Sequence, residues 1–94
     1  MKNYETVFIL STTIDEQTTK ATIEKFTNLI SSQGQIQKID EWGKRRLAYE
    51  INKTNEGYYV YVEFAAESDF VAELERNYRI ADSVLRYLVV KKEK

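Results

Sequence analysis

The order of hydrophobic patterns along this chain limits most strongly the folds that it can adopt. Runs rich in β-branched and aromatic residues, which are typical of strands, alternate with apolar residues at helical spacing. Ile23, Phe26 and Ile30 mark the first helix, and Gly34 is expected to end it in a left-handed conformation. The predicted strands are residues 4–10, 35–51, 58–66 and 84–90, with helices after the first and third strands.

This order predicts a ferredoxin-like β-α-β-β-α-β sandwich, an α+β fold with two helices on one face of a four-stranded antiparallel sheet. A chain of 94 residues has the length of one domain, so residues 1–94 are expected to form a single unit. From the rule that strand–helix–strand crossovers are right-handed, we expect the first and third strands to be parallel neighbours at the centre of the sheet. A bulge or bend is expected at Gly43, with Trp42 beside it as a packing anchor.

The two faces of the predicted sheet differ in composition, because successive strand side chains point to opposite faces. The face expected to meet the helices holds Phe8, Leu10, Val60, Val62, Phe64 and Val89. The second face holds Val7, Ile9, Tyr59, Tyr61, Leu88 and Val90, with Glu5, Glu63, Arg86 and Arg46. An uncovered patch of this composition is typical of an interface with a macromolecule. The alternative is a partly hydrated face, which antiparallel sheets commonly have.

The composition excludes several kinds of site. The chain has no cysteine and no histidine, so it lacks thiolate metal ligands and the commonest general base. Its net charge is −1, so any binding of nucleic acid must come from a local basic patch, with help from a partner. The N-terminal residues lack a signal-peptide pattern, and no apolar run approaches the length of a membrane span, so an intracellular location is expected.

Three consecutive cations, Lys44, Arg45 and Arg46, lie within the long second strand. One interpretation is structural, because exposed charge on an edge strand discourages pairing with other strands. The other is functional, because guanidinium groups suit phosphate contacts and Tyr49, on the same segment, can stack on a base. The residues alone leave both interpretations open.

Tyr4-Glu5 near the start, "GKRRLAYEI", "KTNEGYYVYVEF" and the final "RNYRIADSVLRYLVVK" resemble the bacterial ribosomal protein S6 family. The resemblance extends over essentially the whole chain and preserves the order and length of the elements. It implies a structural protein of the small ribosomal subunit, with no catalytic activity, no cofactor and a cytoplasmic, ribosome-associated location. It also implies two partners, the central domain of 16S ribosomal RNA and the small basic ribosomal protein S18, for a chain that is monomeric when isolated.

The resemblance also assigns candidate contact residues. Arg45, Arg46 and Tyr49 match the basic-aromatic motif of the family, whereas Arg79 and Arg86 match the cations flanking its last strand. S18 is expected to bind through the second sheet face and the basic edge. With that face included, the RNA- and partner-binding candidates are Lys2, Tyr4, Glu5, Lys44, Arg45, Arg46, Tyr49, Tyr59, Tyr61, Arg79, Arg86 and Leu88.

Other functions hosted by this fold predict different features. A ligand-binding or regulatory module predicts a stable homodimer through the second face. An acylphosphatase-like enzyme needs a phosphate-binding loop, yet residues 11–16, STTIDE, contain no glycine and no arginine. An RNA recognition motif has a basic residue where this chain has Glu56, before Gly57. Tyr59 and Tyr61 are therefore expected to face a protein rather than RNA bases.

Overall fold

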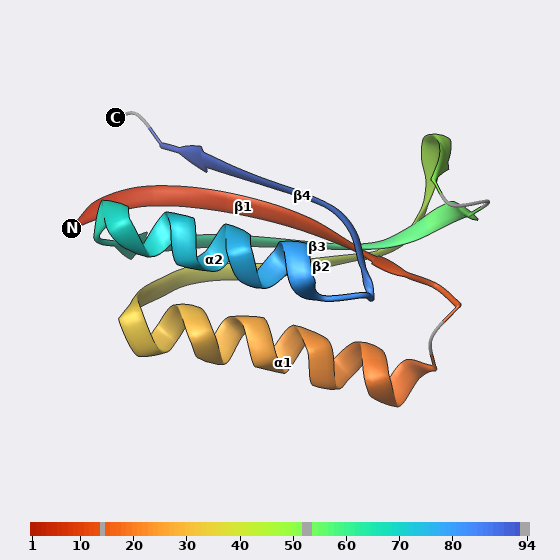
Figure 1. The fold of residues 1–94 in the computed structure, drawn as a ribbon, viewed down its shortest axis with the longest axis horizontal. Coiled ribbons are helices and arrows are strands. Elements are labelled where there is room, and N and C mark those ends of the chain that lie inside the picture. The colour runs from red at the N-terminus through yellow and green to blue at the C-terminus, as the bar shows by residue number, and fades with distance from the viewer. Residues whose placement is uncertain (14, 52–53, 93–94) are drawn as a thin grey trace.

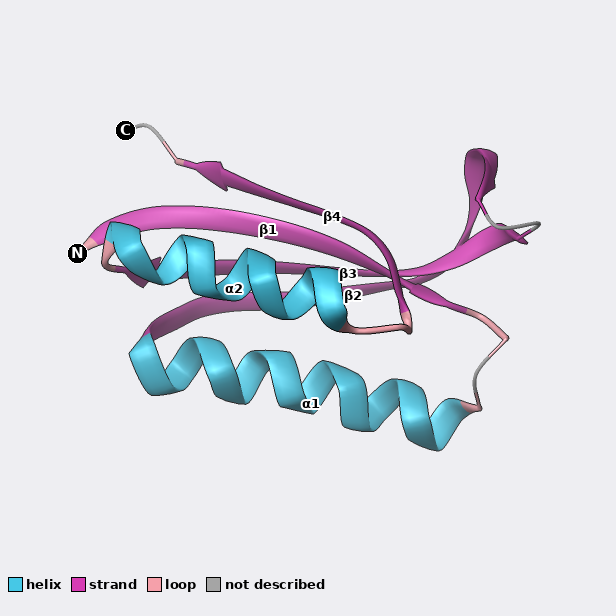
Figure 2. Ribbon diagram, in the orientation of Figure 1, coloured by secondary structure: helices cyan, strands magenta, loops and turns pink. Residues whose placement is uncertain are grey.

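A computed structural model describes residues 1–13, 15–51 and 54–92, with the side chains of 48–51 and 54–55 not described. The elements are β1 (Lys2–Ser11), α1 (Glu16–Gln33), β2 (Gly34–Ile51), β3 (Thr54–Ala66), α2 (Ser68–Ile80) and β4 (Val84–Lys91). The strands form one sheet in the order β2-β3-β1-β4, and all neighbouring strands are antiparallel. Both helices lie on one side of this sheet (Figure 2). The ferredoxin-like architecture expected from the sequence is confirmed.

The direction of the central strands differs from the prediction. β1 and β3 are neighbours, but they run antiparallel, with Phe8 opposite Val60. The crossover through α1 skips one position in the sheet, so β1 and β2 run in the same direction without pairing. β3 returns from β2 through a hairpin and fills the skipped position, so it must run against both. The parallel pairing of the first and third strands was therefore a wrong prediction.

The junction between α1 and β2 also differs from the prediction. Gly34 has φ −164° and ψ −153°, so its backbone is extended and not left-handed. It pairs at once with Ala66 as the first residue of β2. A Cβ atom at Gly34 would overlap the carbonyl oxygen of Ala65. The glycine is needed because two backbones approach closely, not because the helix requires a left-handed cap.

The core lies between the helices and the sheet face that the sequence assigned to it. The assigned strand residues Phe8, Leu10, Val60, Val62 and Phe64 are buried, and Val89 packs against them. The rings of Phe8, Phe26 and Tyr78 have centroids 4.7 to 5.3 Å apart, which joins β1 to both helices. Among the described residues, neither helix has the length and apolar character needed to cross a bilayer.

One polar group is accommodated at the centre of this core. The Tyr78 hydroxyl lies 3.0 Å from Thr6 Oγ1, and Thr6 donates its own hydrogen to the Leu88 carbonyl at 2.9 Å. Since a hydroxyl has a single hydrogen, Tyr78 must be the donor to Thr6. Burial raises the pKa of Tyr78 above its ordinary value of 10.0, because the phenolate would have to lose its hydration.

The free energy of unfolding should therefore be steady from pH 7 to 9 and fall above pH ~10, where the unfolded chain ionises its tyrosines first. Tyr78→Phe removes one group with a raised folded-state pKa, so the alkaline decline should become shallower. At neutral pH the variant should lose about 1 kcal/mol with the hydrogen bond. Urea unfolding of both proteins between pH 7 and 11 measures this. Parallel curves would exclude Tyr78 as a source of the alkaline decline.

The β2–β3 hairpin continues beyond the helices and rises away from the rest of the sheet (Figure 1). The cationic run lies at the base of this extension, with Lys44, Arg45 and Arg46 opposite Tyr58, Gly57 and Glu56 in the ladder, and Tyr58 and Gly57 still pair with the end of β1. The fold thus places the run where the β2–β3 hairpin leaves the end of β1.

Candidate functional site

The sheet face opposite the helices is not covered by any element of the described chain, and we call it the open face. Exposed large apolar side chains on it include Leu88 at 59%, Val90 at 41% and Trp42 at 39%. Tyr59 and Tyr61 beside them are half-buried. Its main members, by strand register and ring contacts, are Glu5, Val7, Ile9, Trp42, Arg45, Tyr59, Tyr61, Glu63, Arg86, Leu88 and Val90.

An aromatic stack dominates the centre of the open face. The Trp42 ring is nearly parallel to that of Tyr61, at 11° and 5.6 Å between centroids, and lies 6.2 Å from that of Tyr59. The Arg45 guanidinium sits 5.5 Å from the Trp42 ring centroid, within the range of a cation–π contact. Four side chains from two strands thus form one platform of rings with a cation at its end.

A β-bulge in β2 lies at Trp42. Glu41 pairs with Val60 and Gly43 with Tyr59, so Trp42 is an extra residue in β2. Gly43 has φ +82°, a conformation that residues with a Cβ atom rarely adopt. The bulge expected from the sequence at Gly43 is confirmed. Trp42 keeps the side of Asp40, whereas the residues after it change sides.

The other end of the open face carries a pair of carboxylates. Glu5 and Glu63 are directly opposite each other in the β1–β3 ladder. The Tyr61 hydroxyl lies 2.8 Å from Glu5 Oε2 and 2.7 Å from Glu63 Oε2, and it can donate to one of them at a time. Lys92 Nζ donates to Glu63 Oε1 at 2.9 Å. This cross-strand network holds the Tyr61 ring in place under the indole.

The network also shifts the pKa values of Glu63 and Tyr61. The hydrogen bond from Lys92, followed by that from Tyr61, lowers the pKa of Glu63. The hydrogen bond to Glu63 raises the pKa of Tyr61, because ionisation would place a third negative charge beside two carboxylates. At neutral pH Glu63 is therefore a carboxylate, Tyr61 a neutral phenol and Lys92, whose pKa the Glu63 hydrogen bond raises, an ammonium group.

The structure divides the predicted contact residues between two sides of the sheet. Six of the twelve candidates lie on the open face: Glu5, Arg45, Tyr59, Tyr61, Arg86 and Leu88. Lys44 lies on the helix side, where it lines a cavity with residues of α1. Arg79 is also on that side and donates to the Tyr87 hydroxyl at 3.4 Å.

The bulge at Trp42 determines how the three cations are divided. Without the extra residue, Lys44 and Arg46 would share the open face with Asp40, which pairs with Tyr61. The extra residue exchanges the two faces for every side chain after it. The Arg45 side chain therefore lies on the open face, and the Lys44 and Arg46 side chains point to the helix side. The expectation that Arg46 belongs to the second sheet face was therefore wrong.

The remaining candidates lie elsewhere. Tyr4 is only 6% exposed, and its ring stacks on Phe64 in the core at 5.6 Å between centroids. Its predicted role as a contact residue is corrected, because a partner cannot reach a side chain buried beneath the helices. Lys2 is exposed. It lies two residues before Tyr4 in β1, so its side chain points to the same face of the sheet as Tyr4, the face that the helices cover. The side chain of Tyr49 lies outside the described part of the chain.

The model of the family described as Ribosomal protein S6 matches residues 3–91 of this chain. The chain belongs to the ribosomal protein S6 family. The small ribosomal subunit protein bS6 of Clostridium novyi is 53% identical over 95 residues, and that of Alkaliphilus oremlandii 48% over 94, each alignment covering 100% of both chains. The crystal structure of 30S ribosomal protein S6 from Thermotoga maritima matches with a TM-score of 0.92 and 30% identity, covering 97% of this chain and 87% of that one.

Membership in the S6 family makes this chain a structural component of the small ribosomal subunit and not an enzyme. The expected cytoplasmic, ribosome-associated location follows from the same membership. Sequence reasoning reached the family but treated Trp42 as a packing anchor, whereas the structure places its ring on the open face. The available signal was a bulky aromatic directly before a glycine at a predicted bulge.

Proposed function

We propose that this S6-family chain binds the central domain of 16S ribosomal RNA together with ribosomal protein S18, which covers the open face. The observation that carries the proposal is the exposed stack of Trp42 on Tyr59 and Tyr61, on the same face as the exposed Leu88 and Val90 of β4. Aromatic side chains are enriched in the buried centres of interfaces, and the described chain supplies no element to cover these.

Charge gives the reason why two proteins act together. A chain with a net charge of −1 gains little from the counterion release that drives RNA binding. A basic partner on the open face adds positive charge, and the Glu5–Glu63 pair offers a local site of opposite sign to its cations. The resulting pair of proteins presents a more basic surface to the RNA than this chain does alone.

The projecting hairpin fits a role beside both partners. Arg45 lies on the open face next to Trp42, where S18 would bind, while Lys44 and Arg46 point to the other side. Lysine and arginine side chains at the base of a projecting hairpin suit contacts with phosphates, which fix position without reading sequence. The same hairpin can therefore contact a protein on one face and RNA on the other.

Binding of RNA should be cooperative. A central-domain RNA fragment titrated with both proteins should be bound at least about 10-fold more tightly than with either alone, within the usual range of coupling between sites. Gel-shift or calorimetric titrations with this chain, with S18 and with both measure the effect. Near-additive affinities would contradict the proposal, and a stable homodimer that ignores RNA would favour the ligand-binding module instead.

A further inference from the structure

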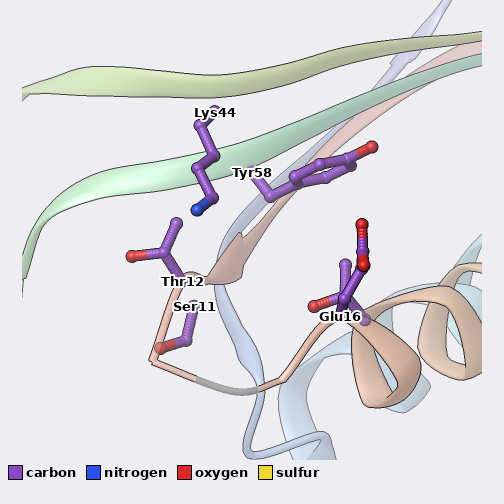
Figure 3. Close-up of a pocket in the computed structure, with 6 residues that line it drawn as sticks. Ser11, Thr12, Glu16, Lys44 and Tyr58 are labelled. Atoms are coloured by element: carbon purple, nitrogen blue, oxygen red, sulfur yellow. The ribbon is translucent and has the colours of Figure 1, made fainter.

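A cavity lined by residues with polar or charged groups lies on the helix side of the β2–β3 hairpin, across the sheet from the open face. Its volume is about 340 Å³, and it is lined by Ser11, Thr12, Glu16, Thr19, Lys44 and Tyr58. Figure 3 shows the amino group of Lys44 directed toward Thr12, while Glu16 lies beside the ring of Tyr58. The cavity therefore has a cationic end and an end that combines an aromatic ring with a carboxylate.

The Tyr58 ring is held in place before any ligand arrives. Its hydroxyl donates to Glu41 Oε1 at 2.9 Å, and its ring packs against the core. That hydrogen bond raises the pKa of Tyr58, so the phenol is neutral at physiological pH. A fixed, neutral, half-buried ring is a suitable stacking surface, because little conformational freedom is lost on binding.

The two charged groups of the cavity are not paired with each other. Within the described residues, neither Lys44 nor Glu16 forms a salt bridge. The start of α1 is already capped, because the Asp15 carboxylate accepts from the Thr18 amide at 2.7 Å. The charged groups that the cavity offers a ligand are thus an ammonium at one end and a carboxylate next to an aromatic ring at the other.

We infer that this cavity receives one unpaired nucleotide of the RNA, with its base stacked on Tyr58 and its phosphate at Lys44. The inference rests on the proposed function, since it names the RNA feature that the helix side of the hairpin contacts. Single-stranded bases are commonly bound by stacking on aromatic side chains. A cavity of about 340 Å³ falls within the size range of small-ligand pockets.

Glu16 adds a selection among bases. An ionised carboxylate only accepts hydrogen bonds, so it favours bases that donate from an exocyclic amine, such as cytosine or adenine. Uracil has no such amine: it presents a carbonyl oxygen in its place, which repels the carboxylate, and its one base-edge donor is N3–H, between two carbonyl groups. The cavity should therefore prefer a cytidine or adenosine nucleotide to a uridine nucleotide.

The first test compares Tyr58→Leu with the matched variant Tyr58→Phe in RNA binding with S18 present. Tyr58→Leu should weaken RNA affinity about 10-fold, the effect of losing one stacked base, whereas Tyr58→Phe keeps the ring and should bind as the parent does. Lys44→Met, at an exposed position, should reduce the slope of affinity against salt by about one. Circular dichroism of each variant checks that it is folded.

The second test needs neither S18 nor the ribosomal RNA. Millimolar cytidine monophosphate added to this chain should shift the NMR signals of Thr12, Lys44 and Tyr58 more than uridine monophosphate does. Glu16→Gln should abolish that difference, because the amide can also donate to uracil.

The outcomes separate the inference from the proposed function. If the parent and S18 bind RNA cooperatively but folded Tyr58→Leu and Lys44→Met are unchanged, the cavity is not a nucleotide site and the function stands. If S18 binding without RNA is weakened by Tyr58→Leu, the cavity holds a protein segment and the inference fails. If cooperative RNA binding is absent, the proposed function fails. If cytidine and uridine monophosphate shift the NMR signals of the cavity residues equally, the inference fails as well.

Discussion

Trp42→Ala is expected to weaken S18 binding by about 30-fold or more while leaving the fold intact. A truncated aromatic residue at the centre of an interface typically costs at least 2 kcal/mol, which corresponds to that factor. In the isolated chain the indole is 39% exposed and contacts the tyrosines on the surface rather than the core, so its loss should affect unfolding little. Calorimetric titration of S18 into each protein measures the effect.

A matched control lies on the helix side of the molecule. Ile80, the last residue of α2, is 64% exposed, so Ile80→Ala also removes a large exposed apolar side chain. It should bind S18 as the parent does. Tyr61→Ala should weaken S18 binding in the same direction as Trp42→Ala, because it removes the ring beneath the indole.

Two results would contradict this assignment of the open face. Unchanged S18 affinity in folded Trp42→Ala would show that the aromatic stack is not at the centre of the interface. Loss of binding to naked single-stranded RNA in Tyr61→Ala, with S18 binding retained, would assign the stack to base recognition.

The sheet and its two faces were predictable because they depend on the alternation of apolar residues, which is a local property. Val62 lies between Tyr61 and Glu63, and Phe8, Val62 and Phe64 fall on a face without charged residues, so the buried face could be assigned without coordinates. The direction of β3 was not misread from any residue. The predicted parallel direction of β3 was wrong because the consequence of the β2–β3 hairpin was overlooked. A hairpin from β2 forces β3 to run antiparallel to β2 and to β1.

The contact residues were less predictable because a bulge changes which side chains share a face. If side chains along β2 are assigned to alternate faces and the bulge at Trp42 is ignored, then Lys44, Arg45 and Arg46 are each assigned to the wrong face of the sheet. Gly43 marks the region of the bulge but not which residue is the extra one. Tyr4 was misassigned for a different reason, since a tyrosine in a first strand can serve the core or the surface equally well.

Gly34→Ala is expected to lower the free energy of unfolding by about 3 kcal/mol, the upper part of the range for overpacking. The added Cβ would overlap the Ala65 carbonyl oxygen, a backbone atom that cannot rotate away as a flexible side chain can. Relief requires α1 and the start of β2 to shift from β3. Thermal unfolding should show a midpoint about 12 to 24 °C lower, given the usual relation for a domain of this size.

Gly43→Ala is the matched control because it makes the same chemical change in a different environment. No atom lies within 4 Å of a Cβ atom built at Gly43, so its cost comes from the backbone at φ +82°. That conformation costs a residue with a Cβ atom about 1 to 2 kcal/mol. Gly34→Ala should therefore be the more destabilising, although Gly34 is extended and Gly43 is not. If urea unfolding showed Gly43→Ala to be the more destabilised variant, the α1–β2 junction would have to shift to accept a Cβ atom at a lower cost than its close backbone contact implies.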